Sequence, residues 1–506
     1  MQEAIAVLDV GKTNKKIVLF DQRLNTLSII KKAFPAVERN GLFIETPDRV
    51  LSWFLDNLKH FSQEYRIRAI SVAAHGAEAV FVDENGELTV PPLSYTNSSP
   101  ASIVEDFYRK FGSRKQLYIS TATPEVGDMV NLAKLIHFAQ HKFPEQFRNT
   151  ARILPYPQYF VYKLTGKAVA EPTILGCHTY LLDAQTRKYS SVVDGLGIRK
   201  MLPKKISKSW DSPGKLLNHI CQNYSLPEDC AVTSGILDSN SSLLPYIISS
   251  KNDFVLNSTG TWCVAMRPSK KAELTEDQIG KMIFYNFDVF NNPVKTSIFM
   301  GGKEYEAYTK LLDNISSPRK TSEQERSVYS KVLEEADKFI LPSVLPGMGI
   351  FGAGKGRAVE GGRTINFEDM TKENCPQFFK HRKTADAVLA LSLAIQSSVA
   401  LRHAGYKEGD KIYVEGGFAE NKPYLNLLQK LFPRSEGYTV SIPQASSAGA
   451  AILALAAIEG KAPDQLDIEL NFQSQRVPLD NNLNLDYYLQ KYLKLLGNDV
   501  QGSVLS

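Results

Sequence analysis

Two segments of the chain, one at its start and one just past its middle, share a strand–turn–strand plan. The first, at 4–21, has an apolar strand ending in Asp9 and Gly11, then a polar turn and a second strand. The second, at 254–266, has an apolar strand, a turn of small hydroxyl residues and glycine, and another strand. At 506 residues the chain is also longer than one hydrophobic core usually supports. The sequence therefore predicts a duplicated architecture with one such turn in each half.

Mixed strands and helices follow each hairpin. The spacing of apolar residues predicts helices at 50–61, 384–403 and 447–458, and strands at 69–74, 79–82 and 411–415. Ser446 or Ser447 is expected to cap the last of these helices. We therefore expect an α/β protein of two domains, 1–247 and 248–506.

The bulk composition limits the kinds of partner. The net charge is only +5, and the basic residues are scattered, which favours a solvated surface over a nucleic-acid patch. The five cysteines include no C-x-x-C pair, which argues against a disulfide framework or a structural zinc site. The start of the chain does not resemble a signal peptide, and the apolar stretch at 448–458 is shorter than the roughly 20 residues that span a bilayer. We expect a cytoplasmic protein without nucleic-acid or membrane partners, and the sequence leaves a homodimer open.

The two turns have the composition of phosphate-binding loops. In the first turn, Gly11 lets the backbone approach a ligand, Thr13 and the backbone amides can donate to phosphate oxygens, and Lys16 adds charge. Asp9, at the end of a buried strand, is placed to hold a magnesium ion through water. A plain hairpin with a polar loop explains the first turn equally well. The second turn, at 258–261, repeats the chemistry, and the pair favours a nucleotide phosphate chain held from two sides.

Two further segments carry candidate site residues. Asp238 follows an apolar stretch and precedes a predicted helix at 241–248, so it can be a base for an incoming hydroxyl, a helix N-cap, or both. His75, Gly76 and Glu78 lie between two predicted strands, where they either face a cleft or form a turn with a satisfied histidine.

Together these segments resemble the FGGY family of carbohydrate kinases, most closely its rhamnulokinase and fuculokinase branch, over roughly 5–458. The first hairpin resembles the family's first phosphate segment, and 258–262 its second. The segment 235–242 is similar to the one that carries the catalytic base, and 414–421 to the Gly-Gly segment that contacts adenine and ribose.

The resemblance implies a role for each matching residue. It places the catalytic base at Asp238 and the magnesium contact at Asp9. The implied ATP phosphate contacts are Gly11, Lys12, Thr13, Asn14, Lys16, Thr259, Gly260 and Thr261; the implied adenosine contacts are Gly416, Gly417, Phe418 and Asn421; and the implied substrate contacts are His75, Gly76, Glu78 and Asp238.

The resemblance also implies two actin-like (ribonuclease-H-like) ATPase domains around a central cleft, with ATP and Mg2+ against the second and the sugar against the first. The implied activity is transfer of the ATP γ-phosphate to a sugar hydroxyl, with a ketose such as L-rhamnulose or L-fuculose as acceptor. The chain departs from the family pattern at Lys12 and Phe418 among the implied nucleotide contacts. It also departs at His75, Glu78 and Tyr95 among the substrate positions, so the sugar can differ. Two alternatives remain: an actin-like or chaperone-like ATPase without a sugar substrate, and a catalytically inactive sugar-binding relative.

Overall fold

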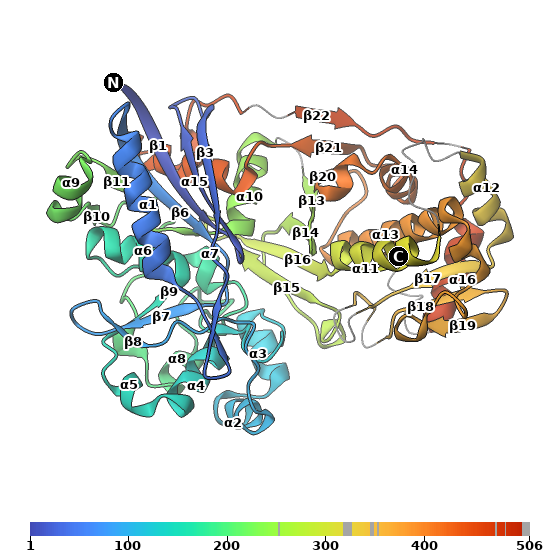
Figure 1. Ribbon diagram of the computed structural model, residues 1–506, viewed down its shortest axis with the longest axis horizontal. Coiled ribbons are helices and arrows are strands. Elements are labelled where there is room, and N and C mark those ends of the chain that lie inside the picture. Colours follow the sequence, from blue (N-terminus) through green and yellow to red (C-terminus); the bar gives the residue numbers. More distant parts are fainter. Residues whose placement is uncertain are drawn as a thin grey trace.

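Figure 1 shows the protein as a computed structural model that describes residues 1–250, 253–316, 326–344, 349–351, 354–470, 473–480 and 482–497. Each half of the chain is built on a mixed seven-stranded sheet flanked by helices. The first sheet has the order β10-β11-β6-β1-β2-β3, with β12 also paired to β6, and the second has the order β15-β16-β14-β13-β20-β21-β22. The predicted α/β class is confirmed.

The first half contains the elements up to α10. Its strands are β1 (Gln2–Val10), β2 (Asn14–Phe20), β3 (Thr26–Ala33), β4 (Val37–Arg39), β5 (Leu42–Ile44), β6 (Tyr65–Ala74), β7 (Ala79–Val82), β8 (Leu88–Val90), β9 (Arg152–Pro155), β10 (Gly214–Lys215), β11 (Ala231–Val232) and β12 (Ile236–Leu237). Its α-helices are α1 (Pro47–Phe61), α2 (Ala101–Phe111), α3 (Arg114–Thr121), α4 (Leu132–Lys142), α5 (Pro144–Arg148), α6 (Tyr156–Thr165), α7 (Pro172–Leu175), α8 (Ser191–Gly195), α9 (Asn218–Tyr224) and α10 (Asp238–Ser249), with a 3-10 turn, η1 (Arg199–Met201).

The second half begins with β13. Its strands are β13 (Phe254–Thr259), β14 (Cys263–Pro268), β15 (Ile283–Phe287), β16 (Pro293–Phe299), β17 (Lys338–Leu341), β18 (Arg357–Glu360), β19 (Arg363–Asn366), β20 (Lys411–Gly416), β21 (Gly437–Ser441) and β22 (Gln473–Arg476). Its α-helices are α11 (Gly301–Ile315), α12 (Arg326–Glu335), α13 (Arg382–His403), α14 (Lys422–Leu431), α15 (Ala445–Glu459) and α16 (Asp486–Leu496). Its 3-10 turns are η2 (Glu276–Gln278), η3 (Phe367–Asp369), η4 (Gln377–Lys380), η5 (Gly417–Glu420) and η6 (Pro463–Gln465).

The two sheets repeat one pairing pattern, which confirms the predicted duplication. In the first sheet β1 pairs antiparallel with β2 and parallel with β6. In the second sheet β13 pairs antiparallel with β14 and parallel with β20. Each hairpin predicted from the sequence is therefore the centre of its sheet, and each turn lies at the carboxyl end of a parallel strand.

Helices α10 and α15 join the halves where they cross. A Cβ atom on Gly449 of α15 would lie 1.8 Å from the Ser241 carbonyl oxygen of α10, so only glycine permits this approach. The Ser241 hydroxyl donates to the Ser446 carbonyl at 2.6 Å. The apolar residues of α15 pack with β1, β2 and β6, so this late segment completes the core of the first half (Figure 1).

Two expected helix caps are wrong. Helix α15 begins at Ala445 after Gln444, and the hydroxyls of Ser446 and Ser447 donate to Asp9 instead of capping the helix. Helix α10 begins at Asp238 itself, so this residue is in the first turn and the N-cap position belongs to Leu237. The expected division at 247/248 falls inside α10 and stays a prediction.

Helix α13 forms the centre of the second core. It is apolar on all sides, long enough by length and composition to cross a bilayer, and 94% buried over its most apolar 18 residues. A helix that is apolar all round is typically enclosed by protein. Here α13 packs against α11, α14 and β17 within the core cluster of the second half.

Candidate active site

Three parallel strands bring candidate residues to one edge of the first sheet. Strand β6 pairs parallel with β1, so that Ala74 lies beside Val10, and with β12, so that Ala74 lies beside Leu237. The next residues are therefore neighbours: the turn after β1, His75 after β6 and Asp238 after β12. Because ligands of open α/β sheets bind outside the carboxyl ends of parallel strands, this edge is the candidate site.

The turn after β1 is shaped by Lys15. This lysine is fully buried, and its Nζ donates to the carbonyls of Gly11 at 2.9 Å, Lys12 at 2.8 Å and Phe34 at 3.3 Å. A Cβ on Gly11 would lie 2.9 Å from the Asn14 carbonyl oxygen, so the turn requires glycine. The hydrogen bonds from Lys15 to these carbonyls fix the conformation of the turn. The side chains of Thr13 and Asn14 are exposed at its tip.

Asp9 connects this turn to the second half. Its Oδ2 pairs with Lys16 Nζ at 2.9 Å and accepts hydrogen bonds from the hydroxyls of Ser446 at 2.5 Å and Ser447 at 2.7 Å. Lys16 also donates to Gln444 at 3.2 Å. The carboxylate that was predicted to hold magnesium is thus fixed through one oxygen, while its Oδ1 has no hydrogen bond or ion pair within the described residues.

Asp238 has the properties of a base that works near neutral pH. Burial raises its pKa to about 7, and the negative charge of Asp9 adds to the increase. Its Oδ1 accepts the backbone N–H of Ser239 at 2.7 Å, which fixes the carboxylate at the start of α10. A carboxylate with this pKa takes a proton from a hydroxyl more readily than an ordinary aspartate does.

Lys12 lies among acidic and aromatic residues rather than toward a phosphate position. Its Nζ contacts Glu45, Glu78 Oε1 at 2.7 Å and Ser94 Oγ at 2.5 Å, and lies 4.5 Å from the centre of the Tyr95 ring. Burial lowers the pKa of Lys12, but the two carboxylates outweigh burial and the net shift is upward. In this conformation the Lys12 ammonium is held by acidic side chains, and its predicted contact with ATP phosphate stays a prediction.

His75 and Glu78 form a buried polar wall beside Lys12. Ala77 adopts a left-handed φ of 68° between them, and His75 Nε2 lies 3.6 Å from Glu78 Oε2. Both of these atoms and the Tyr156 hydroxyl are buried without a hydrogen-bond partner among the residues that the structure describes. Burial lowers the pKa of His75 to about 4, so the ring is neutral near pH 7. Unpartnered buried donors and acceptors suit a ligand rich in hydroxyl groups.

Tyr95 lies near both the His75–Glu78 wall and Asp238, because its pKa responds to the charges of Glu78 and Asp238. Burial raises the pKa of Tyr95, and the charges of Glu78 and Asp238 contribute further to the increase. The His75 ring meets Tyr95 edge-on at 5.7 Å and lies 5.0 Å from Tyr156. The predicted substrate residues His75, Glu78 and Asp238 are therefore brought together.

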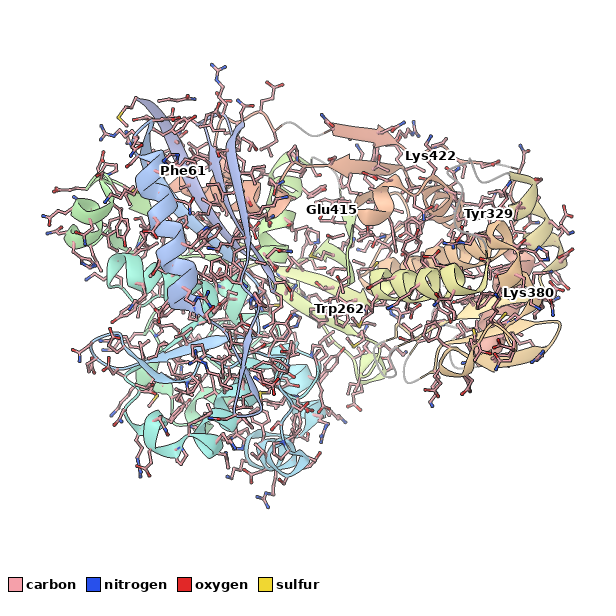
Figure 2. The ribbon with its side chains drawn as sticks, in the orientation of Figure 1. Phe61, Trp262, Tyr329, Lys380, Glu415 and Lys422 are labelled. Atoms are coloured by element: carbon pink, nitrogen blue, oxygen red, sulfur yellow. The ribbon has the colours of Figure 1, made fainter. Side chains whose placement is uncertain are left out.

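The second turn is joined to the Gly-Gly segment. The Thr259 hydroxyl donates to the Glu415 carbonyl and accepts from the Phe418 N–H at 2.9 Å, so it is already engaged by protein. A Cβ on Gly416, where φ is 82°, would lie 2.0 Å from the Thr259 carbonyl oxygen. Gly260 and Thr261 are exposed at the tip of the turn. Trp262 and Glu415 mark this edge of the second sheet in Figure 2, on the side nearest the first half.

The predicted adenosine residues divide into exposed and buried ones. Gly416 and Gly417 are exposed, whereas Phe418 packs in the second core against Tyr305 and Tyr424. The Asn421 side chain caps α14 by accepting the Tyr424 N–H at 3.2 Å. In this conformation the exposed glycines and the backbone beside them are accessible to a nucleotide, whereas the Phe418 ring is buried.

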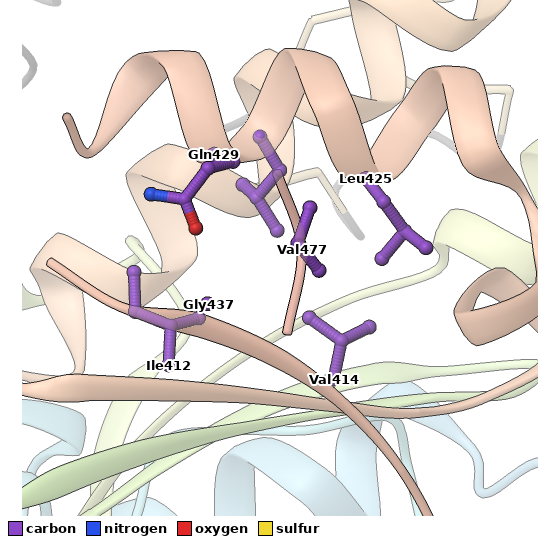
Figure 3. Close-up of a pocket in the computed structure, with 7 residues that line it drawn as sticks. Ile412, Val414, Leu425, Gln429, Gly437 and Val477 are labelled. Atoms are coloured by element: carbon purple, nitrogen blue, oxygen red, sulfur yellow. The ribbon is translucent and has the colours of Figure 1, made fainter. Parts of the chain in front are cut away.

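Behind this segment lies a small cavity, shown in Figure 3. It is enclosed by α14, β20 and β21, and residues such as Val414, Leu425 and Gln429 line it. Its volume of 10 Å³ is at the lower limit for one water molecule, so it is a packing gap and no ligand site. A cavity of 700 Å³ lies in the first half beside the β4–β5 hairpin and the start of α1, and Glu45 belongs both to its lining and to the contacts of Lys12.

The sequence did not reveal several residues of this site. Glu45, the partner of Lys12, is 3% exposed and directly follows the apolar strand β5. A carboxylate immediately after an apolar strand was the sequence feature that could have identified it as a site residue. Gly301 and Gly302 begin α11, where a Cβ on Gly302 would lie 1.9 Å from the Gly260 carbonyl oxygen. This Gly-Gly pair at a helix start was visible in the sequence, but its partner turn was not.

The fold and this arrangement define the class: a two-domain protein of the actin-like ATPase fold, with its candidate site between duplicated domains. Residues 4–245 match the N-terminal domain of the FGGY family of carbohydrate kinases, and residues 251–463 match the carbohydrate kinase FGGY C-terminal domain. The chain belongs to the FGGY family of carbohydrate kinases.

Individual relatives are distant. The chain is 25% identical to L-fuculokinase of Escherichia coli (strain K12) over 54% of this chain and 58% of that protein. It is 29% identical to rhamnulokinase of Enterococcus faecalis over 38% of each. The chain thus matches 58% of the length of the first of these curated relatives and 38% of the second. A solved carbohydrate kinase from Novosphingobium aromaticivorans is 26% identical with a TM-score of 0.80, covering 97% of this chain and 100% of that one.

Proposed function

We propose that this protein is an ATP-dependent sugar kinase that transfers the γ-phosphate of ATP to a sugar hydroxyl, with Asp238 as the base. The observation that carries the proposal is Asp238 itself: a carboxylate with a pKa of about 7, at the carboxyl end of β12 and beside Asp9 and the phosphate-type turn. Family membership supports the activity, and the similarity to L-fuculokinase and rhamnulokinase supports a ketose such as L-rhamnulose or L-fuculose as acceptor.

In this proposal the first half binds the sugar. The hydroxyls of the sugar would fill the unpartnered positions on His75 Nε2, Glu78 Oε2 and the Tyr156 hydroxyl. Lys12 then acts as a substrate contact, because its ammonium already lies among Glu78, Ser94 and Tyr95. Asp238 accepts the proton of the hydroxyl that attacks, which makes that oxygen a better nucleophile.

The nucleotide would lie against the second half, with its phosphates between the two turns. Gly11, Thr13, Asn14 and Lys16 approach from the first sheet, and Gly260 and Thr261 approach from the second, while Thr259 positions its turn through its contacts with Glu415 and Phe418. Gly416 and Gly417 leave room for adenosine. Phosphoryl transfer depends mainly on such positioning and on stabilising negative charge.

A magnesium ion fits the chemistry of Asp9. Magnesium prefers carboxylate, phosphate and water oxygens, and the Oδ1 atom of Asp9 is not engaged by the described residues. The charge of Asp9 raises the pKa of Asp238, so a cation near Asp9 would also relieve the repulsion between the two carboxylates. When bound with ATP, the ion supplies charge neutralisation for the phosphates.

The test is a coupled assay of ATP consumption across a panel of ketoses, aldoses and polyols. At least one sugar should stimulate ATP use, and Asp238→Asn should lower that turnover by about 100-fold to 10,000-fold while ATP binding is retained. Asp56→Asn, on the exposed side of α1, is the matched control and should keep full turnover. ATP hydrolysis that no sugar stimulates would instead support an ATPase, and sugar binding without turnover would support an inactive relative.

A further inference from the structure

A second cluster of ionisable side chains lies outside the candidate active site. Asp106 comes from α2, and His137 and His141 come from successive turns of α4. In Figure 1, α2 and α4 lie at the end of the first half that is distant from α10, where Asp238 begins. None of the residues proposed for phosphoryl transfer belongs to this cluster.

The spacing of the three side chains matches a metal site. One ligand atom of each lies within 4.8 Å of the others. His137 Nε2 is 3.0 Å and His141 Nε2 is 3.7 Å from the same oxygen, Asp106 Oδ2. For metal–ligand bonds of about 2.0–2.1 Å in a tetrahedral site, neighbouring ligand atoms are about 3.4 Å apart. The observed distances lie on either side of that value.

The tautomer of His141 provides independent support. Its Nδ1 lies 2.8 Å from the carbonyl oxygen of His137, which can only accept, so Nδ1 carries the proton. Its Nε2, on the other side of the ring, faces the Asp106 carboxylate at 3.7 Å. A backbone carbonyl that holds the other ring nitrogen is also the usual outer partner of a metal-bound histidine.

The groups that now neutralise Asp106 are able to move. Lys110 Nζ lies 2.8 Å from Oδ2, and Arg109 contacts Oδ1. Both side chains are about half exposed or more, at 49% for Lys110 and 76% for Arg109, so each can turn into solvent. The Asp106 carboxylate is only 15% exposed, so a bound metal ion would take the place of Lys110 as its cationic partner. A metal on His137 Nε2 would place the proton of that ring on Nδ1, which has no hydrogen-bond partner within the described part of the chain.

We propose that Asp106, His137 and His141 bind one divalent transition-metal ion of the zinc, nickel and copper class, with solvent as the remaining ligand. Two imidazoles and one carboxylate favour these ions over magnesium, which prefers oxygen ligands. The ion would fasten α2 to α4. It is separate from any magnesium that accompanies ATP.

The experiment uses the full chain without a polyhistidine tag, stripped with a chelator and titrated with Co2+ and with Zn2+. We expect saturable binding of one ion, a cobalt absorption band in the visible range, and an increase in Tm on adding Zn2+. A large excess of Mg2+ should not displace the ion. His141→Ala should weaken binding by at least about tenfold and abolish the Tm increase.

The variants are chosen to separate lost binding from lost folding. His141 is 38% exposed on its side chain, so His141→Ala should fold, and circular dichroism with the Tm of the metal-free variant checks this. Asp106→Asn should weaken binding in the same way. His219→Ala removes an exposed histidine on α9 and should bind like the unchanged chain. Absence of binding by the unchanged chain, or equal binding by folded His141→Ala, would overturn the proposal.

Discussion

The hydroxyl of Ser447 donates a hydrogen bond of 2.7 Å to Oδ2 of Asp9, across 438 positions of the chain. Asp9 lies near the carboxyl end of β1 in the first sheet, and Ser447 is in the first turn of α15, which follows β21 of the second sheet. With the Ser446 hydroxyl and Lys16 on the same oxygen, this contact fixes the proposed magnesium ligand against the second half.

Ser447→Ala should destabilise the protein by about 1–2 kcal/mol, because it removes a buried hydrogen bond to a charged acceptor. The KM for ATP should rise as well, since Asp9 loses one of the groups that fix it. Thermal unfolding and steady-state kinetics measure the two effects. Ser398→Ala is the control, because that buried hydroxyl donates to the nearby Ile395 carbonyl and has no other hydrogen bond among the described residues. A Ser447→Ala protein with unchanged Tm and KM would contradict the proposed role.

The pKa of Asp238 predicts a pH profile. The kcat/KM of the sugar reaction should fall as the pH decreases below about 7, because the base becomes protonated. The raised pKa also affects stability: the folded state favours the protonated carboxyl, so stability is lost as the pH rises from about 4 to about 7. Asp238→Asn should therefore raise Tm at pH 8 and change it much less at pH 4. An equal change in Tm at pH 8 and pH 4 would show that folding does not raise the pKa of Asp238.

Lys12→Met should leave Glu45 and Glu78 buried without their shared cation, and the cost should be about 3 kcal/mol. The loss should be larger at pH 8 than at pH 5, because a carboxylate that lacks its partner is protonated at low pH. Lys115→Met serves as the control, since its pair with Glu276 is exposed on both sides. Urea unfolding of both variants at the two pH values makes the comparison, and a similar small loss in each would argue against a stabilising Lys12 cluster.

Glu78→Ala tests the division of the site between the two substrates. Its carboxylate has an unpartnered buried oxygen in the proposed sugar pocket, and it has no described contact with either phosphate-type turn except through Lys12. The KM for the sugar should increase by about tenfold or more, while the KM for ATP changes little. Equal increases in both values would remove Glu78 from the sugar site.

Gly416→Ala should separate the second turn from the Gly-Gly segment. The new Cβ would lie 2.0 Å from the Thr259 carbonyl oxygen, so either the turn or β20 must shift. We expect a raised KM for ATP and a Tm loss greater than that of Gly280→Ala. Gly280 is the matched control, because its φ is 80° and nothing lies within 4 Å of its Cβ position. If the two variants behave alike, the cost comes from backbone conformation alone.

The elements with strong local signals were predicted well. Apolar runs that end in glycine or small polar residues located both hairpins, and the apolar spacing located α1, α13 and α15 within a few residues. The helix caps failed for a physical reason. An N-cap hydroxyl accepts a backbone N–H, but α15 begins at Ala445, so Ser446 and Ser447 lie inside its first turn and their hydroxyls donate to the distant carboxylate of Asp9.

The direction of Lys12 could not be predicted from its position. A lysine in a phosphate-type turn is chemically suited to a phosphate, and nothing nearby in the sequence indicates another partner. The carboxylates that attract it are 33 and 66 residues away, on different elements. Likewise, the pKa of Asp238 depends on burial and on Asp9, and both arise only when β1, β6 and β12 align.

The sequence by itself determined the duplicated strand–turn–strand plan, the family and the chemical types available at each turn. These follow from local patterns, because glycine, hydroxyl and carboxylate residues act through their own backbone and side chains. The tertiary structure decided which of them meet: Ser447 with Asp9, Lys12 with Glu45 and Glu78, and Thr259 with Gly416. Such pairings form only when segments that are distant in the sequence pack together, so no single segment predicts them by its own local pattern.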